Sequence, residues 1–415
     1  MTMLDDLIDY LDSSPSPWHA VASTMARLNG FEQLDERAAW DGVPDRGVVV
    51  RDGALVAWSI PAGASPSTGF RIGGAHTDSP CLRIKPNPDR SSVGWKQLGV
   101  EVYGGILNNT WLDRDLGIAG RLVAADGAQV LVNVAEPVAR VPQLAVHLDR
   151  GVNDEGLTLD RQRHLAPVWG IGASTPGEFA SWIGERAGMS SAPTWWDLCL
   201  YDVQGASVVG VDKSLLTSAR LDNQLSCWAA TVALEGATPI DHIAVIVLND
   251  HEEVGSSSNT GAQGPLLETV LSRIVDARGG SPDDFHRALA DSACVSADNA
   301  HAVHPNYVER HDPDHRPVVN AGPAIKVNAN QRYATSATTA AMFQRACESA
   351  GVPWQVFVSR NNMPCGSTIG PITATQLGID TVDVGIPQLS MHSARELCGV
   401  DDTEHLARAL GAFFD

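Results

Sequence analysis

The sequence has few of the features that mark secreted, membrane-spanning or low-complexity proteins. It contains no run of about 18 apolar residues, so no segment is predicted to cross a membrane. Residues 1–13 are acidic and lack the basic start of a signal peptide. No low-complexity tract interrupts the chain, and a composition of 44% hydrophobic and 19% charged residues is that of a globular protein.

Cysteine and positive charge are also scarce. The seven cysteines are scattered without paired spacing, which indicates reduced thiols and a cytoplasmic location. Lysine and arginine total 29 against 49 acidic residues, which gives a formal net charge of -20. So acidic a chain is poorly suited to bind nucleic acid or an anionic membrane surface, and we expect neither as a partner.

Strand and helix patterns alternate in the second half of the chain and so predict an α/β sheet layered by helices. Residues 86–211 instead combine short β-like runs with many Gly and Pro and few convincing helices. We predict an α/β fold with a mixed sheet sandwiched by helices, formed by residues 1–86 and 212–415, and an inserted β-rich domain at 87–211. The expected helices are 3–11, 18–28, 221–234, 266–275, 283–291, 335–350 and 367–377. The expected strands are 48–60, 70–75, 120–124, 129–134, 242–248, 293–296, 324–328, 354–359 and 379–385.

The stretch "VIVLNDHEEVGSSS", residues 245–258, runs from an apolar strand into the charged residues 250–253, which end in two adjacent glutamates. Neighbouring side chains on an extended segment point in opposite directions. We therefore expect Glu252 and Glu253 to have different roles. A glutamate pair by itself is more often simply a solvated face.

Other acids and histidines also follow strands or begin helices. They are His76 and Asp78 in "GGAHTDSP", Asp222 in "RLDNQLS", Asp298 in "SADNAHA" and His392 in "SMHSARE". Each alone has an ordinary explanation, such as a helix cap, a turn or a hydrogen-bonded pair. Together, imidazoles and carboxylates without cysteine suit a divalent metal such as zinc. The set is too large for one catalytic zinc and suits two metals that share a bridging carboxylate.

These motifs, in this order, resemble the aspartyl aminopeptidase family of metallopeptidases with two co-catalytic zinc ions. The resemblance spans nearly the whole chain. It includes "SSPSPWHAV", "GGAHTDSPCLRIKP", "YGGILNNTWLDRDLGIAGR", "VPQLAVHLDR", "DHEEVGSSSNTGA", "IKVNANQRYAT", "MPCGSTIGP" and "SMHSARE". Residues 105–111 depart from the family pattern, which bears on local interface detail but not on the metal ligands.

The resemblance implies a role for each matching residue. His76 and Asp298 would bind one zinc, His392 and Glu253 the other, and Asp222 would bridge them. Asp78 would accept the second ring N–H of His76 and fix its orientation. Glu252 would be the general base towards a water activated by the metals. Cobalt or manganese can occupy such sites as well as zinc.

The resemblance also implies the substrate and the assembly. The family often removes N-terminal Asp or Glu from small peptides, and Lys326 and Tyr333 match the residues that contact the acidic side chain. His147 matches a residue that reaches the active site of a neighbouring subunit. The β-rich domain would form dimers, and the dimers a dodecamer. The alternatives are a preference for neutral N-terminal residues, a two-metal N-acyl amino acid deacylase and a catalytically silent scaffold.

Overall fold

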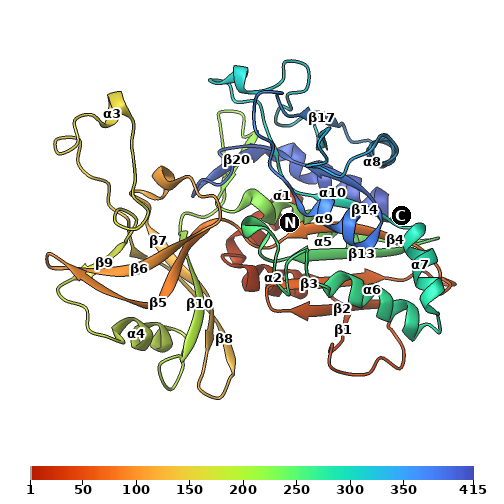
Figure 1. Cartoon of the computed structure of the whole chain (residues 1–415), viewed down its shortest axis with the longest axis horizontal. Helices are drawn as coiled ribbons and strands as arrows, with labels where there is room; N and C mark the ends of the chain where they lie inside the picture. Colours follow the sequence, from red (N-terminus) through yellow and green to blue (C-terminus); the bar gives the residue numbers. More distant parts are fainter. Residues whose placement is uncertain (1) are drawn as a thin grey trace.

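The computed structural model describes residues 2–415, so that Met1, the start of the first predicted segment, lies outside the described residues. The described chain forms three sheets (Figure 1). The largest has nine strands in the order β1-β2-β3-β13-β4-β14-β18-β16-β17. These strands are β1 (Glu32–Gln33), β2 (Arg46–Arg51), β3 (Ala54–Ser59), β13 (Ile243–Asn249), β4 (Phe70–His76), β14 (Ala293–Ala297), β18 (Asp380–Gly385), β16 (Ala324–Val327) and β17 (Gln355–Val358).

Strand directions in the nine-stranded sheet are mixed. Strands β13, β4, β14 and β18 are neighbours that all run parallel. Strand β3 is antiparallel to β13, and β16 is antiparallel to β18. The predicted mixed α/β sheet is confirmed.

Helices cover both faces of this sheet because its central strands are apolar on both sides. Ile246 of β13 packs into the core beneath one set of helices, and its neighbour Val245 packs into the core on the opposite face. The first set is α1 (Met3–Ser13), α2 (Pro17–Arg27), α5 (Leu221–Gly236), α8 (Ala337–Ala350) and α10 (Val400–Phe414). The second is α6 (Leu266–Ala277), α7 (Pro282–Ala290) and α9 (Ile369–Leu377). No helix among residues 2–415 is both long enough and apolar enough to cross a bilayer.

The second sheet has six antiparallel strands in the order β8-β7-β10-β5-β6-β9 and lies to one side of the main body (Figure 1). Its strands are β5 (Cys81–Ser92), β6 (Trp95–Tyr103), β7 (Leu116–Val123), β8 (Gln129–Ala139), β9 (Val168–Ile171) and β10 (Trp195–Asp202). It has a separate hydrophobic core, into which Phe179 and Ile183 of α4 (Glu178–Arg186) pack. A short helix, α3 (Val152–Glu155), lies in the long loop after β8.

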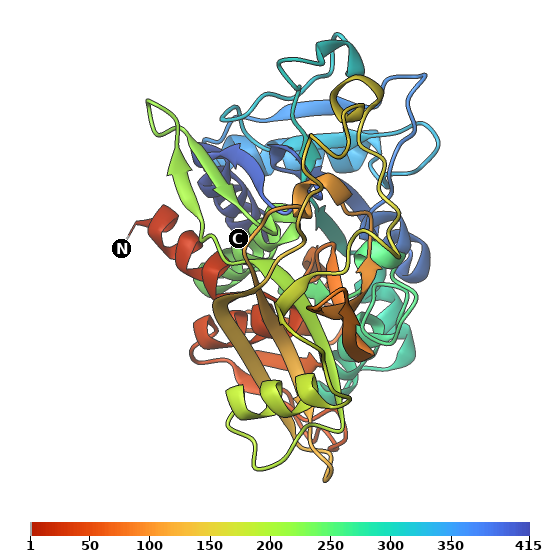
Figure 2. The same cartoon turned by 90° about the vertical axis from the view of Figure 1, so that its left-hand side faces the viewer.

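The third sheet has five short strands in the order β11-β12-β20-β19-β15, which come from widely separated segments between residues 207 and 399. They are β11 (Ser207–Val209), β12 (Leu215–Ser218), β20 (Glu396–Gly399), β19 (Pro387–Leu389) and β15 (Ala300–His301). Turning the molecule shows the strands after residue 200 projecting beside the N-terminal helices (Figure 2). Residues 2–415 also contain three 3-10 turns, which are η1 (Asn108–Trp111), η2 (Glu252–Val254) and η3 (Val308–Arg310).

Two differences from the sequence expectation in the main body have a clear local cause. The strand expected at 48–60 is a hairpin, because Asp52 has a φ of 51° and turns the chain between β2 and β3. The long C-terminal helix α10 was not expected, although its buried Leu406, Leu410 and Phe413 recur at helical spacing.

Candidate active site and metal centre

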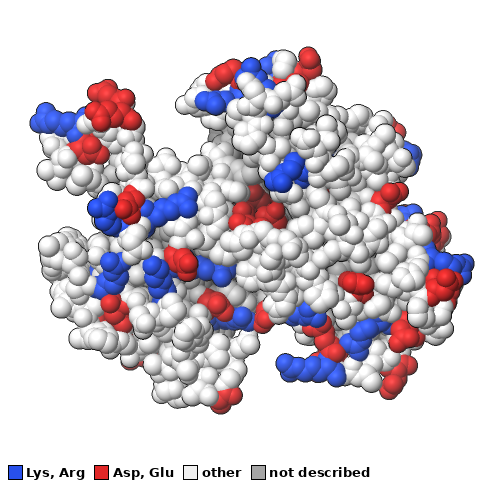
Figure 3. Space-filling model, in the orientation of Figure 1, with Lys and Arg blue, Asp and Glu red and all other residues white. Residues whose placement is uncertain are grey.

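The predicted ligands lie at one edge of the nine-stranded sheet. His76 is the last residue of β4, and Asp298 directly follows β14. Glu252 and Glu253 come three and four residues after β13 ends at Asn249. Because these strands run parallel, their carboxyl ends meet at the same edge, where α/β sheets characteristically bind ligands. A group of acidic atoms lies in a hollow near the centre of this face (Figure 3).

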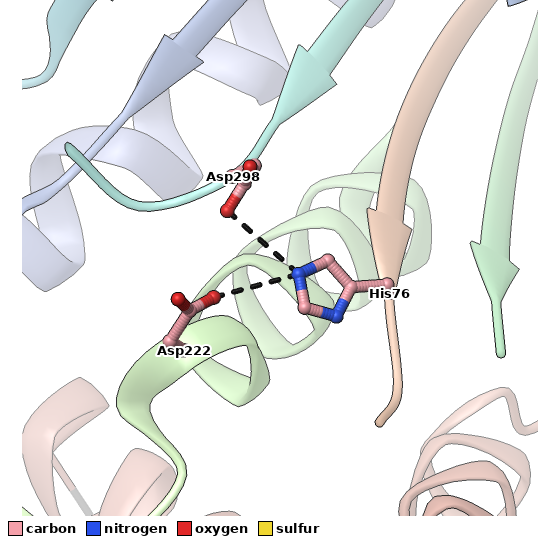
Figure 4. A group of neighbouring side chains, drawn as sticks. All are labelled: His76, Asp222 and Asp298. Carbon is pink, nitrogen blue, oxygen red and sulfur yellow. Dashed lines mark ion pairs between the residues drawn. The ribbon is translucent and has the colours of Figure 1, made fainter. Parts of the chain in front are cut away.

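His76 faces two carboxylates from different elements (Figure 4). Its Nε2 atom is 3.4 Å from Oδ1 of Asp222, which lies in the first turn of α5. The same nitrogen is 3.7 Å from Oδ1 of Asp298. All three residues are buried. We call His76, Asp298 and the Oδ1 atom of Asp222 the His76 half of the centre.

Asp222 also faces a second imidazole. Its Oδ2 atom is 3.5 Å from Nε2 of His392, and Oε2 of Glu253 is 3.4 Å from the same nitrogen. We call His392, Glu253 and the Oδ2 atom of Asp222 the His392 half of the centre. The two oxygens of one carboxylate therefore point to different histidines.

The geometry fits metal ligation better than hydrogen bonding. Hydrogen bonds to nitrogen span about 2.7–3.2 Å. Two ligand atoms that are each about 2.0–2.1 Å from a tetrahedral zinc lie about 3.3–3.4 Å apart. Three of the four nitrogen–oxygen distances are 3.4–3.5 Å. Oδ1 of Asp222 and Oε1 of Glu253 are buried without a hydrogen-bond partner among residues 2–415, as expected of atoms that bind a cation.

The hydrogen bonds of the imidazoles support the same conclusion. Nδ1 of His76 is 3.0 Å from the backbone carbonyl of Asp78, and Nδ1 of His392 is 3.1 Å from the carbonyl of Gly105. A carbonyl only accepts, so each Nδ1 carries the hydrogen. In the neutral rings the lone pair is then on Nε2, which faces the carboxylates in both halves. The residues present therefore fit zinc, which takes neutral imidazole and carboxylate ligands.

Burial and charge shift the pKa values of the cluster. Burial lowers the pKa of the His392 imidazole, but the Asp222 carboxylate outweighs this effect and raises the pKa to about 9. Burial raises the pKa of the Glu252 carboxyl to about 7. A bound cation favours the deprotonated form of both groups and so acts in the opposite direction.

The two glutamates do not lie on an extended segment, so the reason given for their different directions was wrong. They form the 3-10 turn η2, which follows a left-handed residue, His251, with a φ of 62°. Oε2 of Glu253 faces His392, whereas Oε2 of Glu252 is 4.0 Å from Nε2 of His76. The glutamates thus face different histidines because of the turn rather than strand alternation.

Asp78 holds both this turn and His76. Its carboxylate accepts the backbone N–H groups of Glu252 and Glu253, each at 3.1 Å. Its Oδ1 is 3.3 Å from Nδ1 of His76, slightly farther than its own carbonyl. The hydroxyl of Tyr103, at the end of β6, donates to Oδ2 at 2.7 Å. Tyr103 is not among the residues predicted from the sequence, although it opens the family-like motif at 103–121.

Comparisons with known proteins agree with this geometry. Residues 10–414 match the family model described as aminopeptidase I zinc metalloprotease (M18). The chain belongs to the M18 family of zinc aminopeptidases. It is accordingly a zinc-dependent aminopeptidase, and the resemblance seen in the sequence is confirmed.

Several M18 relatives match almost end to end. A probable M18 family aminopeptidase 2 of Streptomyces coelicolor is 54% identical over 417 residues, which cover 99% of this chain and 96% of the relative. One from Mycobacterium leprae is 48% identical over 99% of this chain and 97% of its own length.

Solved M18 structures have the same fold. A cryo-EM structure of the Ape4 and Nbr1 complex superposes with a TM-score of 0.94 at 35% identity, covering 99% of this chain and 85% of that chain. The mApe1 dodecamer of S. cerevisiae gives a TM-score of 0.85 at 29% identity, covering 99% of this chain and 96% of that chain.

The two residues predicted to bind the substrate side chain lie beside the His76 half of this M18 site. Nζ of Lys326 is 3.4 Å from Oδ2 of Asp298 and 5.2 Å from the centre of the Tyr333 ring. Lys326 is buried and also donates to the carbonyl of Asn299. Its positive charge is therefore already partly balanced by a predicted metal ligand.

His147 is not part of the cluster. It is exposed on a turn in the long loop between β8 and α3. That loop extends at the outer end of the β-rich part (Figure 1). Across residues 2–415, His147 belongs to none of the side-chain groups that are close enough to bind a metal together.

Proposed function

We propose that this M18 enzyme binds two zinc ions per chain and uses Glu252 as its general base. Asp222 carries the proposal, because its two oxygens face His76 and His392 at 3.4 and 3.5 Å. His76 and Asp298 would hold one ion, and His392 and Glu253 the other. Cobalt or manganese could replace zinc, since both accept nitrogen and oxygen ligands.

Bound zinc supplies a lowered pKa for water and polarisation of the scissile carbonyl. Glu252 lies beside the His76 half with 16% of its side chain exposed, so its carboxylate is accessible to water. In the proposed reaction it accepts a proton from the attacking water and passes that proton to the leaving amine. Asp78 keeps the Glu252 backbone and the His76 ring in place during these transfers.

We further propose a preference for acidic N-terminal residues in small peptide substrates. Support comes from two arginines near Tyr333. A cavity of about 240 Å³ opens there, and Arg310 and Arg360 are among the residues that line it. Such groups favour a carboxylate over an apolar side chain. Apolar side chains such as Phe357 and Met363 line the same cavity and would suit the competing preference, for neutral residues.

A homo-oligomer is the proposed working form, assembled from dimers into a dodecamer through the β-rich part at 87–211. The loop that carries His147 exposes Leu144, Val146 and Leu148, which are 56%, 49% and 75% accessible. Apolar side chains exposed together indicate a protein contact. Binding of this loop to a neighbouring copy would bring His147 to that copy's active site. All seven cysteines are unpaired, which is consistent with the predicted cytoplasmic location.

One experiment tests these proposals together. Wild type, Glu252→Gln and His147→Ala would be purified, their metal counted, and their turnover of Asp, Glu, Leu and Ala anilides measured. We expect about two zinc ions per chain in all three, acidic substrates best for wild type, and a fall in kcat of about 10²–10⁴-fold in Glu252→Gln. The matched control is Glu268→Gln, which changes an exposed glutamate of α6.

A mixture then tests the role of His147. Dissociating and reassembling Glu252→Gln with His147→Ala should restore part of the activity if His147 acts on a neighbouring copy. Near-normal turnover by Glu252→Gln would remove the general base from the proposal. A metal content of one per chain would remove the two-zinc centre, and equal turnover of Leu and Asp anilides would remove the acidic preference.

A further inference from the structure

A buried glutamate that the proposed reaction does not use lies behind the metal centre. Glu396 is the first residue of β20 and is 2% exposed. Its Oε1 accepts the backbone N–H of His392 at 2.7 Å. Its Oε2 accepts the backbone N–H of Asp222 at 2.9 Å. One carboxylate therefore fixes the backbones of two proposed ligands that are 170 residues apart in the sequence.

The environment of Glu396 provides hydrogen bonds rather than a balancing charge. Within residues 2–415 it forms no ion pair with Lys, Arg or His. Nε2 of Gln388 is a third donor, at 3.4 Å, and Gln388 in turn accepts from Asn299 at 2.9 Å. A buried carboxylate is costly unless such donors satisfy it. The presence of Glu396 in the interior is therefore explained best by its hydrogen bonds to the backbones of His392 and Asp222.

Both backbones that Glu396 holds need an external partner. His392 has a φ of 67°, a left-handed conformation that non-glycine residues seldom adopt without support. Asp222 lies in the first turn of α5, where backbone N–H groups have no partner within the helix. Glu396 satisfies both N–H groups at once and so fixes the turn to the helix end.

We propose that Glu396 is a positioning residue of the metal centre. It sets the spacing between Asp222 and His392 and so prepares the His392 half to bind metal. The inference rests on the proposed two-zinc function. Supporting residues of this kind typically change metal affinity by about 10–100-fold. The His392 half should be affected more than the His76 half, because His76 and Asp298 adjoin strands of the large sheet.

The isosteric substitution Glu396→Gln separates positioning from packing. It keeps the volume but replaces one acceptor oxygen with an NH₂ group that would face a backbone N–H. Glu396→Asp is a second variant, which keeps the carboxyl group but is one methylene too short to reach both N–H groups. The matched control is Glu404→Gln, on α10, where 51% of the side chain is exposed.

The measurement is zinc binding to the metal-free proteins, titrated against a competing chelator, with melting temperatures recorded before and after zinc. In Glu396→Gln and Glu396→Asp we expect the affinity for the first zinc to be nearly unchanged. The affinity for the second zinc should be about 10–100-fold weaker. The rise in melting temperature caused by zinc should shrink in both. Glu404→Gln should match wild type.

Two results would overturn the inference. One is wild-type affinity for both zinc ions in Glu396→Gln. The other is a lower melting temperature of the metal-free variants with undiminished zinc binding, which would indicate a packing role alone. Failure of the two-zinc proposal would be seen separately, because wild type itself would then bind one zinc per chain.

Discussion

The two halves of the metal centre are built differently. In the His76 half, the histidine ends a strand in the middle of the large sheet, Asp298 follows the neighbouring strand, and the His76 side chain is 1% exposed. In the His392 half, the histidine lies in a turn between β19 and β20, and its side chain is 30% exposed. Asp222 belongs to both.

The contrast shows two ways to hold a ligand. A side chain at the end of a central strand inherits its position from the hydrogen-bonded sheet and the packed cores on both faces. A side chain on a turn needs dedicated hydrogen bonds, here from its own N–H to Glu396 and from its ring to Gly105. We therefore expect tighter metal binding in the His76 half and easier exchange in the His392 half.

Removing either histidine should have the largest effect. Replacing a residue that supports a metal ligand typically lowers activity by up to ~100-fold. His76→Ala and His392→Ala should each lower activity by more than this. Their metal contents should differ: about one ion per chain in His392→Ala and less than one in His76→Ala, because the latter also leaves Asp78 buried beside a cavity. Elemental analysis after gel filtration measures this.

His286→Ala, at an exposed position on α7, controls for loss of a histidine elsewhere. If His392→Ala lost both ions while His76→Ala kept one, the proposed order of the two halves would be reversed.

A smaller effect is expected from Tyr103→Phe, mainly in the His76 half, although Asp78 also accepts the backbone N–H of Glu253. The change removes the hydroxyl that donates to Asp78 at 2.7 Å and keeps the ring, 3.8 Å from the Arg83 guanidinium. Affinity for the tighter zinc should fall about 10-fold, at the low end of the range for supporting residues. Tyr10→Phe, which removes another buried hydroxyl bond, should leave zinc binding unchanged. An equal loss of the weaker zinc in Tyr103→Phe would show that the halves are not independent.

The smallest effect should come from Gly105→Ala, which changes the His392 half of the centre. The added Cβ would be 3.3 Å from Nδ1 of His392, so the ring must shift by a few tenths of an ångström. We expect a loss of less than about 10-fold for the weaker zinc and none for the tighter one, measured by the same chelator competition. Gly42→Ala, which meets no atom within 4 Å, is the matched control. A wild-type result would mean that the His392 turn adjusts freely.

The sequence was informative where a local pattern decides the structure. The alternation of apolar runs predicted most elements of the large sheet to within about two residues. The β-rich part was harder, because pairings such as β10 with β5 join segments that no local pattern connects. The helix α10 was readable from its spacing and was overlooked.

The candidate site divides in the same way. His76 and Asp298 could be predicted because they lie at the carboxyl ends of apolar strands. Glu396 could not, because a glutamate near the C-terminus reads as a surface acid until β20 pairs with β12 and buries it. The burial of Lys326 against Asp298 likewise depends on contacts between separate strands.

Strand β6 ends in a short segment that touches both halves of the centre, through the Tyr103 hydroxyl and the Gly105 carbonyl. The β-rich part is therefore no detachable module fused to a self-sufficient enzyme. A gene that lacks codons 87–211 would lose more than the proposed assembly surface, because a hydrogen bond that supports each half of the proposed centre would be lost with it. A shortened version of this peptidase should therefore keep residues 103–105 and strand β6, which holds them in position.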